Sequence, residues 1–223
     1  MLKQGFRAFR ARRDYVENDT SDTGNIHLYP LTGEDVCAPP ADKTFLGRFN
    51  APRHPVLYLS TTREVAIAET RALSTDTCTV ASFKTVRELR LAKLLKKGGF
   101  PLDWLFGENR SEESLSKLLL YQTAEFVSRR VSDSDRDLHY RACNLVASAF
   151  KERGFDGIAY RTSFWSDGWR KEGRSEEEES IFASNIVFFD PLSAIPVDAA
   201  LYRIDWKRPS AAQDGNGYWK AKP

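Results

Sequence analysis

The chain has 223 residues, of which 41% are hydrophobic and 29% are charged. This composition is typical of a folded globular protein and excludes a disordered one, and the length suffices for one domain with a sizeable core. The 33 basic and 31 acidic side chains leave a net charge of +2. We therefore do not expect nucleic acid to be a partner on the strength of charge alone.

The cysteines Cys37, Cys78 and Cys143 lie far apart and form no CxxC pair. This spacing favours neither a disulfide framework nor a zinc site, and it is typical of reduced cytosolic thiols. No run approaches the ~18 apolar residues of a membrane span. Residues 1–14 lack the apolar core of a signal peptide. We expect a cytoplasmic protein that needs no metal and has no membrane partner.

The first predicted element is a strand over residues 5–13, where Phe6 and Ala8 alternate with basic residues. Its four arginines could bind a polyanion, and the simpler interpretation is a solvated strand face. The segment that follows, residues 14–40, is rich in Asp, Thr, Gly and Pro. We expect it to be an irregular loop.

Residues 47–69 combine a loop, a strand and the start of a helix in the sequence GRFNAPRHPVLYLSTTREVAIAE. In the strand over residues 55–60, Leu57 and Leu59 share one face, which we expect to pack on the core. Tyr58 then points to the opposite side, where a binding site or a second layer lies.

The helix in this stretch is predicted to begin at Thr61 and Thr62, because residues 61–64 fit a capping box. One stripe of the helix then carries Val65, Ala68, Glu69 and Ala72. Burying an unpaired carboxylate is costly. Glu69 is therefore paired, at the margin of the core, or lining a cleft.

The rest of the chain alternates strand and helix patterns. We predict strands over residues 77–83, 89–94, 157–160 and 185–189, and helices over residues 111–131 and 135–153. In the first of these helices we expect an inward stripe of Leu115, Leu118, Leu119, Gln122 and Phe126. Residues 166–180 indicate a solvated polar insertion, and residues 208–223 a flexible tail.

The chemistry of the 47–69 stretch lies in Arg48, Tyr58 and Glu69, with a serine near residue 163. The sequence contains no serine-hydrolase elbow, P-loop, dinucleotide-binding glycine fingerprint or HExxH helix. A carboxylate, a guanidinium and an aromatic ring suit the cleavage of an N-glycosidic bond in a charged nucleotide. The carboxylate stabilises the ribosyl cation, the guanidinium binds phosphate and the ring contacts the nicotinamide.

The same stretch resembles the signature of the RES domain family, which runs G-R-[WF]-N, a short loop, V-L-Y-L and a helix with A-x-A-E. The blocks AFRARR, GFDGIAYRTS and NIVFFDP resemble the family as well, so the resemblance covers residues 9–191 in order. It implies an α+β fold with an ADP-ribosyltransferase-like split β-sheet core and surrounding helices. The catalytic domain would then span residues 1–207.

The resemblance implies a toxin of a RES–Xre toxin–antitoxin pair that degrades NAD+ by phosphorolysis or hydrolysis. Glu69, Arg48 and Tyr58 match the catalytic positions. Arg48, Tyr58, Ser163 and Asn50 match the NAD+-binding positions, with Thr162 as a one-place alternative to Ser163. Arg48 would grip phosphate, and Ser163 would hydrogen-bond the nicotinamide end.

The implied enzyme requires no cofactor besides its substrate NAD+, with inorganic phosphate as a candidate co-substrate. An antitoxin or immunity protein would block the cleft. Two alternatives remain open at this point: an ADP-ribosyltransferase that modifies a macromolecule, and a non-enzymatic module that binds a polyanion through the first strand. The sequence leaves open whether water or phosphate is the acceptor.

Overall fold

The structure is a computed structural model that describes residues 1–20, 25–95, 111–164, 181–205 and 220–222. Within these segments, one sheet of eight strands has the order β10-β9-β5-β1-β4-β8-β7-β6. In that order the strands are β10 (Lys220–Lys222), β9 (Ala194–Asp205), β5 (Thr77–Thr85), β1 (Arg7–Arg12), β4 (Leu57–Ser60), β8 (Ser184–Phe188), β7 (Gly157–Arg161) and β6 (Leu91–Leu94). Pairing is antiparallel except between β6 and β7. The predicted α+β class is confirmed.

The sheet is nearly divided between β1 and β4. These strands share one register pair, Phe9 with Ser60, whereas β1 pairs with β5 over six residues and β4 with β8 over four. We call the line between β1 and β4 the seam. Two halves of a sheet joined by one pair form the split sheet that was predicted.

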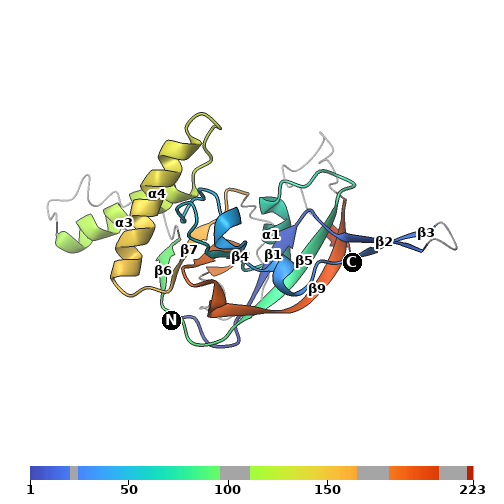
Figure 1. The fold of residues 1–223 in the computed structure, drawn as a ribbon. Coiled ribbons are helices and arrows are strands. Elements are labelled where there is room, and N and C mark those ends of the chain that lie inside the picture. Colours follow the sequence, from blue (N-terminus) through green and yellow to red (C-terminus); the bar gives the residue numbers. More distant parts are fainter. Residues whose placement is uncertain (21–24, 96–110, 165–180, 206–219, 223) are drawn as a thin grey trace.

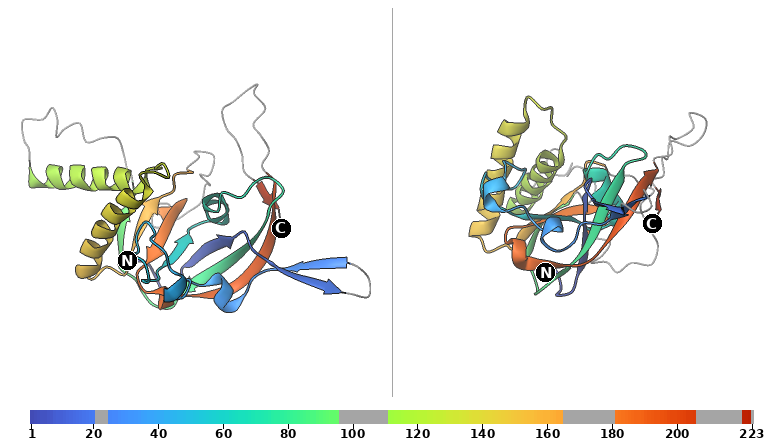
Figure 2. Two further views of the ribbon diagram at one scale, coloured as in Figure 1. Left: turned by 45° about the horizontal axis from the view of Figure 1, so that its top comes forward. Right: turned by 45° about the vertical axis from the view of Figure 1, so that its right-hand side comes forward.

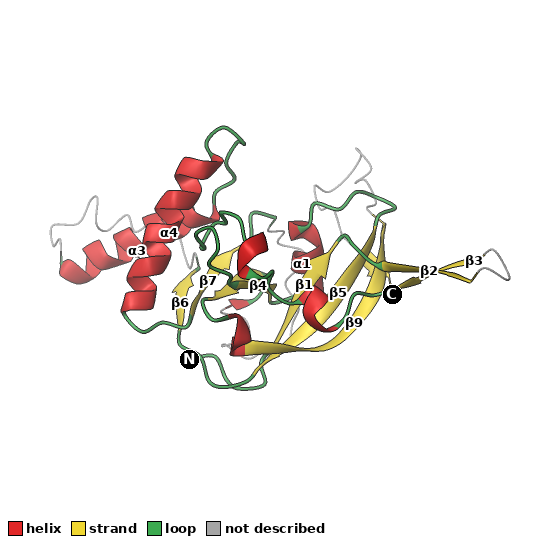
Figure 3. Cartoon of the chain, in the orientation of Figure 1, coloured by secondary structure: helices red, strands yellow, loops and turns green. Residues whose placement is uncertain are grey.

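The helices cover one face of this sheet. They are α1 (Arg63–Glu69), α3 (Glu112–Ser128) and α4 (Arg136–Glu152), and the short 3-10 turns are η1 (Gly33–Val36), η2 (Ala41–Lys43) and η4 (Pro191–Ser193). Figure 1 and Figure 3 show α1 over the middle of the sheet and α3 with α4 at its β6–β7 end.

Alternation along the strands separates the two faces of the core. Leu57 and Leu59 of β4 belong to a cluster on the face without helices, and Tyr58 packs against a second cluster beneath α3 and α4. A third cluster, around Ile67 of α1 and Val80 of β5, lies on the helical face of the other half. The predicted direction of Tyr58 is confirmed, and the seam runs between the two helical clusters.

All three predicted helix starts are close to the observed ones, and side-chain caps fix two of them. Thr62, rather than Thr61, caps α1, because its hydroxyl accepts a 3.2 Å hydrogen bond from the amide of Val65. Ser111 caps α3 by accepting a 3.1 Å hydrogen bond from the amide of Ser114. Such caps satisfy amides that have no partner within the helix.

Two expectations about local structure were wrong. Part of the supposed loop 14–40 forms a ribbon of β2 (Val16–Thr20) and β3 (Asn25–Tyr29), which projects from the body in Figure 2. The expected inward stripe of α3 is largely exposed, with Leu115 at 43% and Leu119 at 59%, while Ala124 and Val127 are buried. Small residues face the sheet there, which brings α3 close to β6 and β7.

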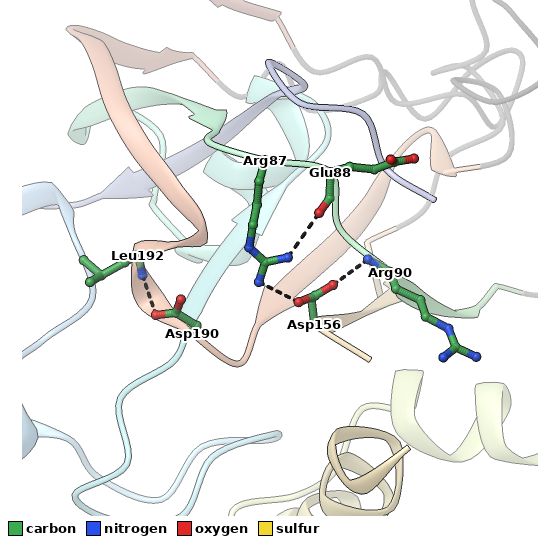
Figure 4. A network of polar contacts seen from close by, with 6 residues as sticks. All are labelled: Arg87, Glu88, Arg90, Asp156, Asp190 and Leu192. Carbon is green, nitrogen blue, oxygen red and sulfur yellow. Dashed lines mark hydrogen bonds and ion pairs between the residues drawn. The ribbon is translucent and has the colours of Figure 1, made fainter. Parts of the chain in front are cut away.

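A polar network joins the loop before β6 to the loop between α4 and β7, as Figure 4 shows. The carboxylate of Asp156 accepts 2.6 Å and 2.7 Å hydrogen bonds from Arg87 Nη2 and the amide of Arg90. Nearby, Asp190 caps η4 by accepting from the amide of Leu192. Asp156 thus fixes the start of β6 beside the start of β7.

Some expectations fall on segments without a description. The polar insertion, residues 166–180, lies outside the described residues, as does most of the expected tail at residues 208–223; of the tail, only β10 is described. Across the described ranges, no helix is both long and apolar enough to cross a membrane.

Candidate functional site

The GRFN motif forms a tight turn beneath Tyr58. Gly47 and Asn50 pair through their backbones, and the Asn50 side chain donates a 2.8 Å hydrogen bond to the carbonyl of Phe45. The Tyr58 hydroxyl donates to Asn50 Oδ1 at 3.0 Å and accepts from the amide of Phe49 at 2.8 Å. A Cβ on Gly47 would lie 2.1 Å from Asn50 Oδ1, so only glycine fits this turn.

These contacts define what Tyr58 and Asn50 can do. Burial raises the pKa of the Tyr58 phenol far above its ordinary value, and the hydrogen bond from Phe49 only partly offsets this. The phenol is therefore neutral, and its hydroxyl is engaged in the turn. Asn50 is buried in the turn and lines neither cavity described below. Its predicted contact with NAD+ stays a prediction.

Arg48 is engaged with the end of a helix. Its Nη1 donates to the carbonyl of Val127 and, at 3.3 Å, to that of Arg129, and its guanidinium lies 5.6 Å from the ring centre of Tyr140. Carbonyls at the C-terminus of a helix have no partner within the helix and carry the negative end of its dipole. Arg48 satisfies two of them at α3. Arg48 holds the C-terminal end of α3 in place. It is not among the residues that line the cavity beside Glu69, which is described below.

Glu69 is the last residue of α1, and its side chain reaches the other half of the sheet. Oε1 accepts hydrogen bonds from Thr162 Oγ1 at 2.7 Å and Asn185 Nδ2 at 2.6 Å. Asn185 is itself fixed, because its Oδ1 accepts from Ser60 Oγ at 2.8 Å. Among the described residues, Oε2 has no hydrogen bond and the carboxylate has no cationic partner. Glu69 is thus an oriented anion with one oxygen available.

A cavity of about 280 Å³ opens at the seam beside Glu69, and we call it the seam cavity. It is lined by residues from both halves of the sheet and from α1, including Phe9, Arg10, Tyr58, Glu69, Tyr160 and Asn185. Every predicted site residue from β4 and α1 therefore reaches one cavity. The prediction that Glu69 lines a cleft is consistent with this position.

Arg10 of β1 is also among the residues that line the seam cavity. Within the described part of the chain, its Nη1 is buried and has no hydrogen-bond partner. Burial, and next the charge of Arg12, lower the pKa of the guanidinium to about 10, so it is still charged at neutral pH. A buried charge without a partner is unfavourable. An oxygen of a ligand would satisfy it.

The other arginines of the first strand have partners within the described fold, although the Nε of Arg12 is buried without a hydrogen bond there. Arg7 pairs with Asp198 at 3.2 Å, and Arg13 pairs with Asp76 at 3.1 Å. Arg12 donates a 2.8 Å hydrogen bond to the carbonyl of Cys37. The basic strand therefore does not present a row of four equivalent cations, which weakens its interpretation as a polyanion-binding face.

The structure separates Thr162 from Ser163. Thr162 is buried and donates to Glu69, whereas Ser163 is exposed and makes no such contact. Sequence reasoning missed the roles of Arg10 and Asn185, although both lie within blocks of the family resemblance. For Asn185 the signal was a polar residue at the start of the otherwise apolar run NIVFF. Arg10 gave no such signal, because its strand also holds Arg7 and Arg12.

A second cavity of about 490 Å³ lies on the other side of Thr162, between the end of α3 and the end of β7. Its lining includes Arg129, Arg130, Arg161, Thr162 and Ser163, and we call it the arginine cavity. No three His, Cys, Asp or Glu side chains gather as a metal-binding group anywhere in the described segments.

The fold and the site together define an α+β domain with a split sheet and an oriented glutamate at its seam. The family model of the RES domain matches residues 7–207, and the chain belongs to this family. No curated protein matches the chain. Among solved structures, it is similar to a chain of the M. tuberculosis MbcT–MbcA toxin–antitoxin complex, at 9% identity and a TM-score of 0.45. That match covers 89% of this chain and 85% of the other.

Proposed function

We propose that this chain degrades NAD+ by cleaving the bond between nicotinamide and ribose in the seam cavity. The observation that carries the proposal is the carboxylate of Glu69, which is oriented through Oε1 and has Oε2 available beside the cavity. Cleavage of this bond develops positive charge on the ribose ring. A preorganised anion is the group that stabilises such a transition state.

The reaction would proceed by loss of nicotinamide from C1 of the ribose. The C1–N bond breaks, and its electron pair goes to the pyridine nitrogen, so neutral nicotinamide leaves. An oxygen of water or of phosphate then bonds to C1, and water would lose a proton to solvent. Glu69 would face the ribosyl cation, and the ring of Tyr58 would contact the nicotinamide or the ribose.

The remaining roles follow from the positions of the arginines. Arg10 would donate to an oxygen of the substrate, which suits the phosphate next to the nicotinamide ribose. Arg48 would act indirectly, because its guanidinium is bound to the end of α3. The predicted role of Arg48 as the phosphate ligand therefore passes to Arg10 in this proposal.

We further propose that the enzyme is a toxin and that an antitoxin or immunity protein covers the seam cavity. NAD+ is consumed throughout metabolism, so an uninhibited enzyme of this kind would starve the cell that makes it. A protein inhibitor that covers Glu69 would prevent this. The support is the family membership together with an open cavity beside an exposed carboxylate.

The test is incubation of the purified protein with NAD+, with and without inorganic phosphate, followed by quantification of free nicotinamide. We expect nicotinamide release, and a Glu69→Gln variant should lose at least roughly a hundredfold in rate, as for other preorganised electrostatic groups. Glutamine preserves the acceptor oxygen for Thr162 and Asn185, so the variant should keep its thermal midpoint. Folded protein that releases no nicotinamide in either condition would refute the proposal.

The reaction products distinguish hydrolysis, phosphorolysis and transfer to a macromolecule. Phosphorus NMR separates ADP-ribose from an ADP-ribose that carries a phosphate at C1, and so separates hydrolysis from phosphorolysis. NAD+ labelled in its adenylate part reveals transfer instead, because the label would then appear on protein or nucleic acid. Label found only in small molecules excludes the macromolecular ADP-ribosyltransferase.

A further inference from the structure

The arginine cavity has features that cleavage at Glu69 does not use. Three arginines, Arg129, Arg130 and Arg161, and one acid, Glu125, belong to the described lining of this cavity of about 490 Å³. Arg161 and Glu125 have partners of their own. Arg129 and Arg130 are therefore the cations to consider for a ligand.

The end of α3 is arranged so that an anion can approach it. The C-terminus of a helix normally repels anions, because its free carbonyls carry partial negative charge. Here Arg48 donates to the carbonyls of Val127 and Arg129. That contact removes the repulsion at the position where Arg129 and Arg130 leave the helix. It also fixes the backbone from which these two side chains extend.

Polar atoms at the cavity wall support the same conclusion. Ser128 lines the cavity, and its hydroxyl is buried without a hydrogen-bond partner among the described residues. Arg130 is held over the ring of Phe164 at 4.4 Å, so its planar guanidinium is already ordered. Buried hydroxyls are nearly always satisfied. A ligand oxygen would satisfy this one.

The cavity is connected to the seam cavity through one side chain. Thr162 lines the arginine cavity, and its hydroxyl donates to Glu69 at 2.7 Å. An anion bound by these arginines would therefore lie on one side of Thr162. Glu69, which lines the seam cavity, lies on the other side. We propose that the arginine cavity is a binding site for a phosphate-bearing anion, held by Arg129 and Arg130 with Ser128.

Two sources have this chemistry: the adenylate part of the dinucleotide, with the phosphate next to its adenosine, and free inorganic phosphate. The site is inferred from the geometry of the cavity alone. Its assignment to the dinucleotide, but not its assignment to free phosphate, rests on the proposed function. Guanidinium groups bind phosphate through paired hydrogen bonds, and either source offers the oxygens for this.

The test is calorimetric titration of the full chain with inorganic pyrophosphate and with inorganic phosphate. The double variant Arg129→Gln/Arg130→Gln should weaken binding by at least about tenfold, since hydrogen bonds to charged groups contribute roughly 1.5–3 kcal/mol each. The matched control is Arg141→Gln/Lys151→Gln, which removes the same charge from exposed positions on α4. The control should change binding by less than about threefold, as expected for screened surface charges.

Competition then identifies the source. In Glu69→Gln protein, displacement of bound NAD+ by pyrophosphate assigns the cavity to the dinucleotide, and simultaneous binding of NAD+ and phosphate assigns it to free phosphate. Pyrophosphate binding without any NAD+ cleavage would refute the proposed function and leave this site intact. Three results would overturn the site. The first is that neither pyrophosphate nor phosphate binds, and the second is that the control pair weakens binding as much as the arginine pair does. The third is that Arg10→Met weakens binding and the arginine pair does not.

Discussion

The carboxylates of Asp156 and Glu69 each accept two hydrogen bonds from described residues, but the bonds are distributed differently over the two oxygens. Asp156 uses both oxygens, one for the guanidinium of Arg87 and one for the amide of Arg90. Glu69 receives both of its hydrogen bonds on Oε1, from the uncharged donors Thr162 and Asn185. Within the described segments, Asp156 is paired with a cation and saturated, whereas Glu69 is oriented, has no cationic partner and keeps one oxygen without a hydrogen bond.

The difference shows how the same residue type becomes structural or functional. A saturated carboxylate contributes stability, because its charge and lone pairs are satisfied within the fold. An oriented carboxylate that lacks a cation retains its charge for a ligand. Arg10, which also lines the seam cavity, has a buried Nη1 with no hydrogen-bond partner among the described residues.

Replacing the buried cation gives the largest expected effect on this comparison. In Arg10→Met we expect kcat/KM for NAD+ to fall a hundredfold or more, because a preorganised charge is lost from the cavity. The free energy of unfolding should stay equal or increase, since a buried unpaired charge is replaced by an apolar chain of similar length. Steady-state kinetics and urea unfolding measure the two quantities.

Arg7→Met is the matched control on the same strand. Arg7 is exposed and paired with Asp198, so its replacement should leave kcat/KM within about twofold and cost less than about 1 kcal/mol. If Arg10→Met destabilised the protein and left turnover unchanged, Arg10 would be a structural residue. The contrast between the residues at the seam and the saturated Asp156 would then fail.

The orientation of Glu69 is tested by a smaller change. In Thr162→Val the carboxylate loses one of its two described donors, and we expect kcat to fall about thirtyfold with little change in KM, in line with roughly 1.5–3 kcal/mol for a hydrogen bond to a charged group. Ser163→Ala should change kcat by less than about twofold, because Ser163 is exposed and does not contact Glu69. A larger loss in Ser163→Ala than in Thr162→Val would return the role to Ser163.

Much of the site's framework was accessible from the sequence, because it depends on local patterns. Alternation placed Tyr58 opposite Leu57 and Leu59, and the structure puts them in different clusters. The cap and the stripe of α1 placed Glu69 next to buried Val65 and Ala68. Strand alternation and helix caps are set by near neighbours in the chain.

What the sequence concealed depends on contacts between distant segments. Thr162 and Asn185 meet Glu69 across 93 and 116 positions, and no local pattern encodes such a meeting. The inward face of α3 was wrong for a related reason, since β6 and β7 accept Ala124 and Val127 rather than the leucines. Arg48 was assigned to a ligand, and only the end of α3 reveals its intramolecular partner.

The saturated carboxylate should show the reverse behaviour of Glu69. In Asp156→Asn we expect the free energy of unfolding at pH 7 to fall by about 1–2 kcal/mol, because the charged hydrogen bonds from Arg87 and Arg90 are weakened. Turnover of NAD+ should remain within about twofold, since Asp156 lines neither cavity. Urea unfolding and nicotinamide release provide the measurements. A loss of turnover without a loss of stability would contradict the structural role.

The pH dependence of that stability difference is the smallest and most specific effect. Burial alone would raise the pKa of Asp156, but the hydrogen bonds from Arg87 and from the amide of Arg90 outweigh it and lower the pKa below its ordinary 3.8. The ionised form therefore stabilises the folded state. Its contribution is complete above the unfolded pKa and disappears as the pH falls through the folded pKa. The gap in unfolding free energy between wild type and Asp156→Asn should be constant from about pH 7 to pH 5 and shrink below about pH 4. A gap that persisted undiminished into that acid range would show that the charge of Asp156 is not what holds the loops together.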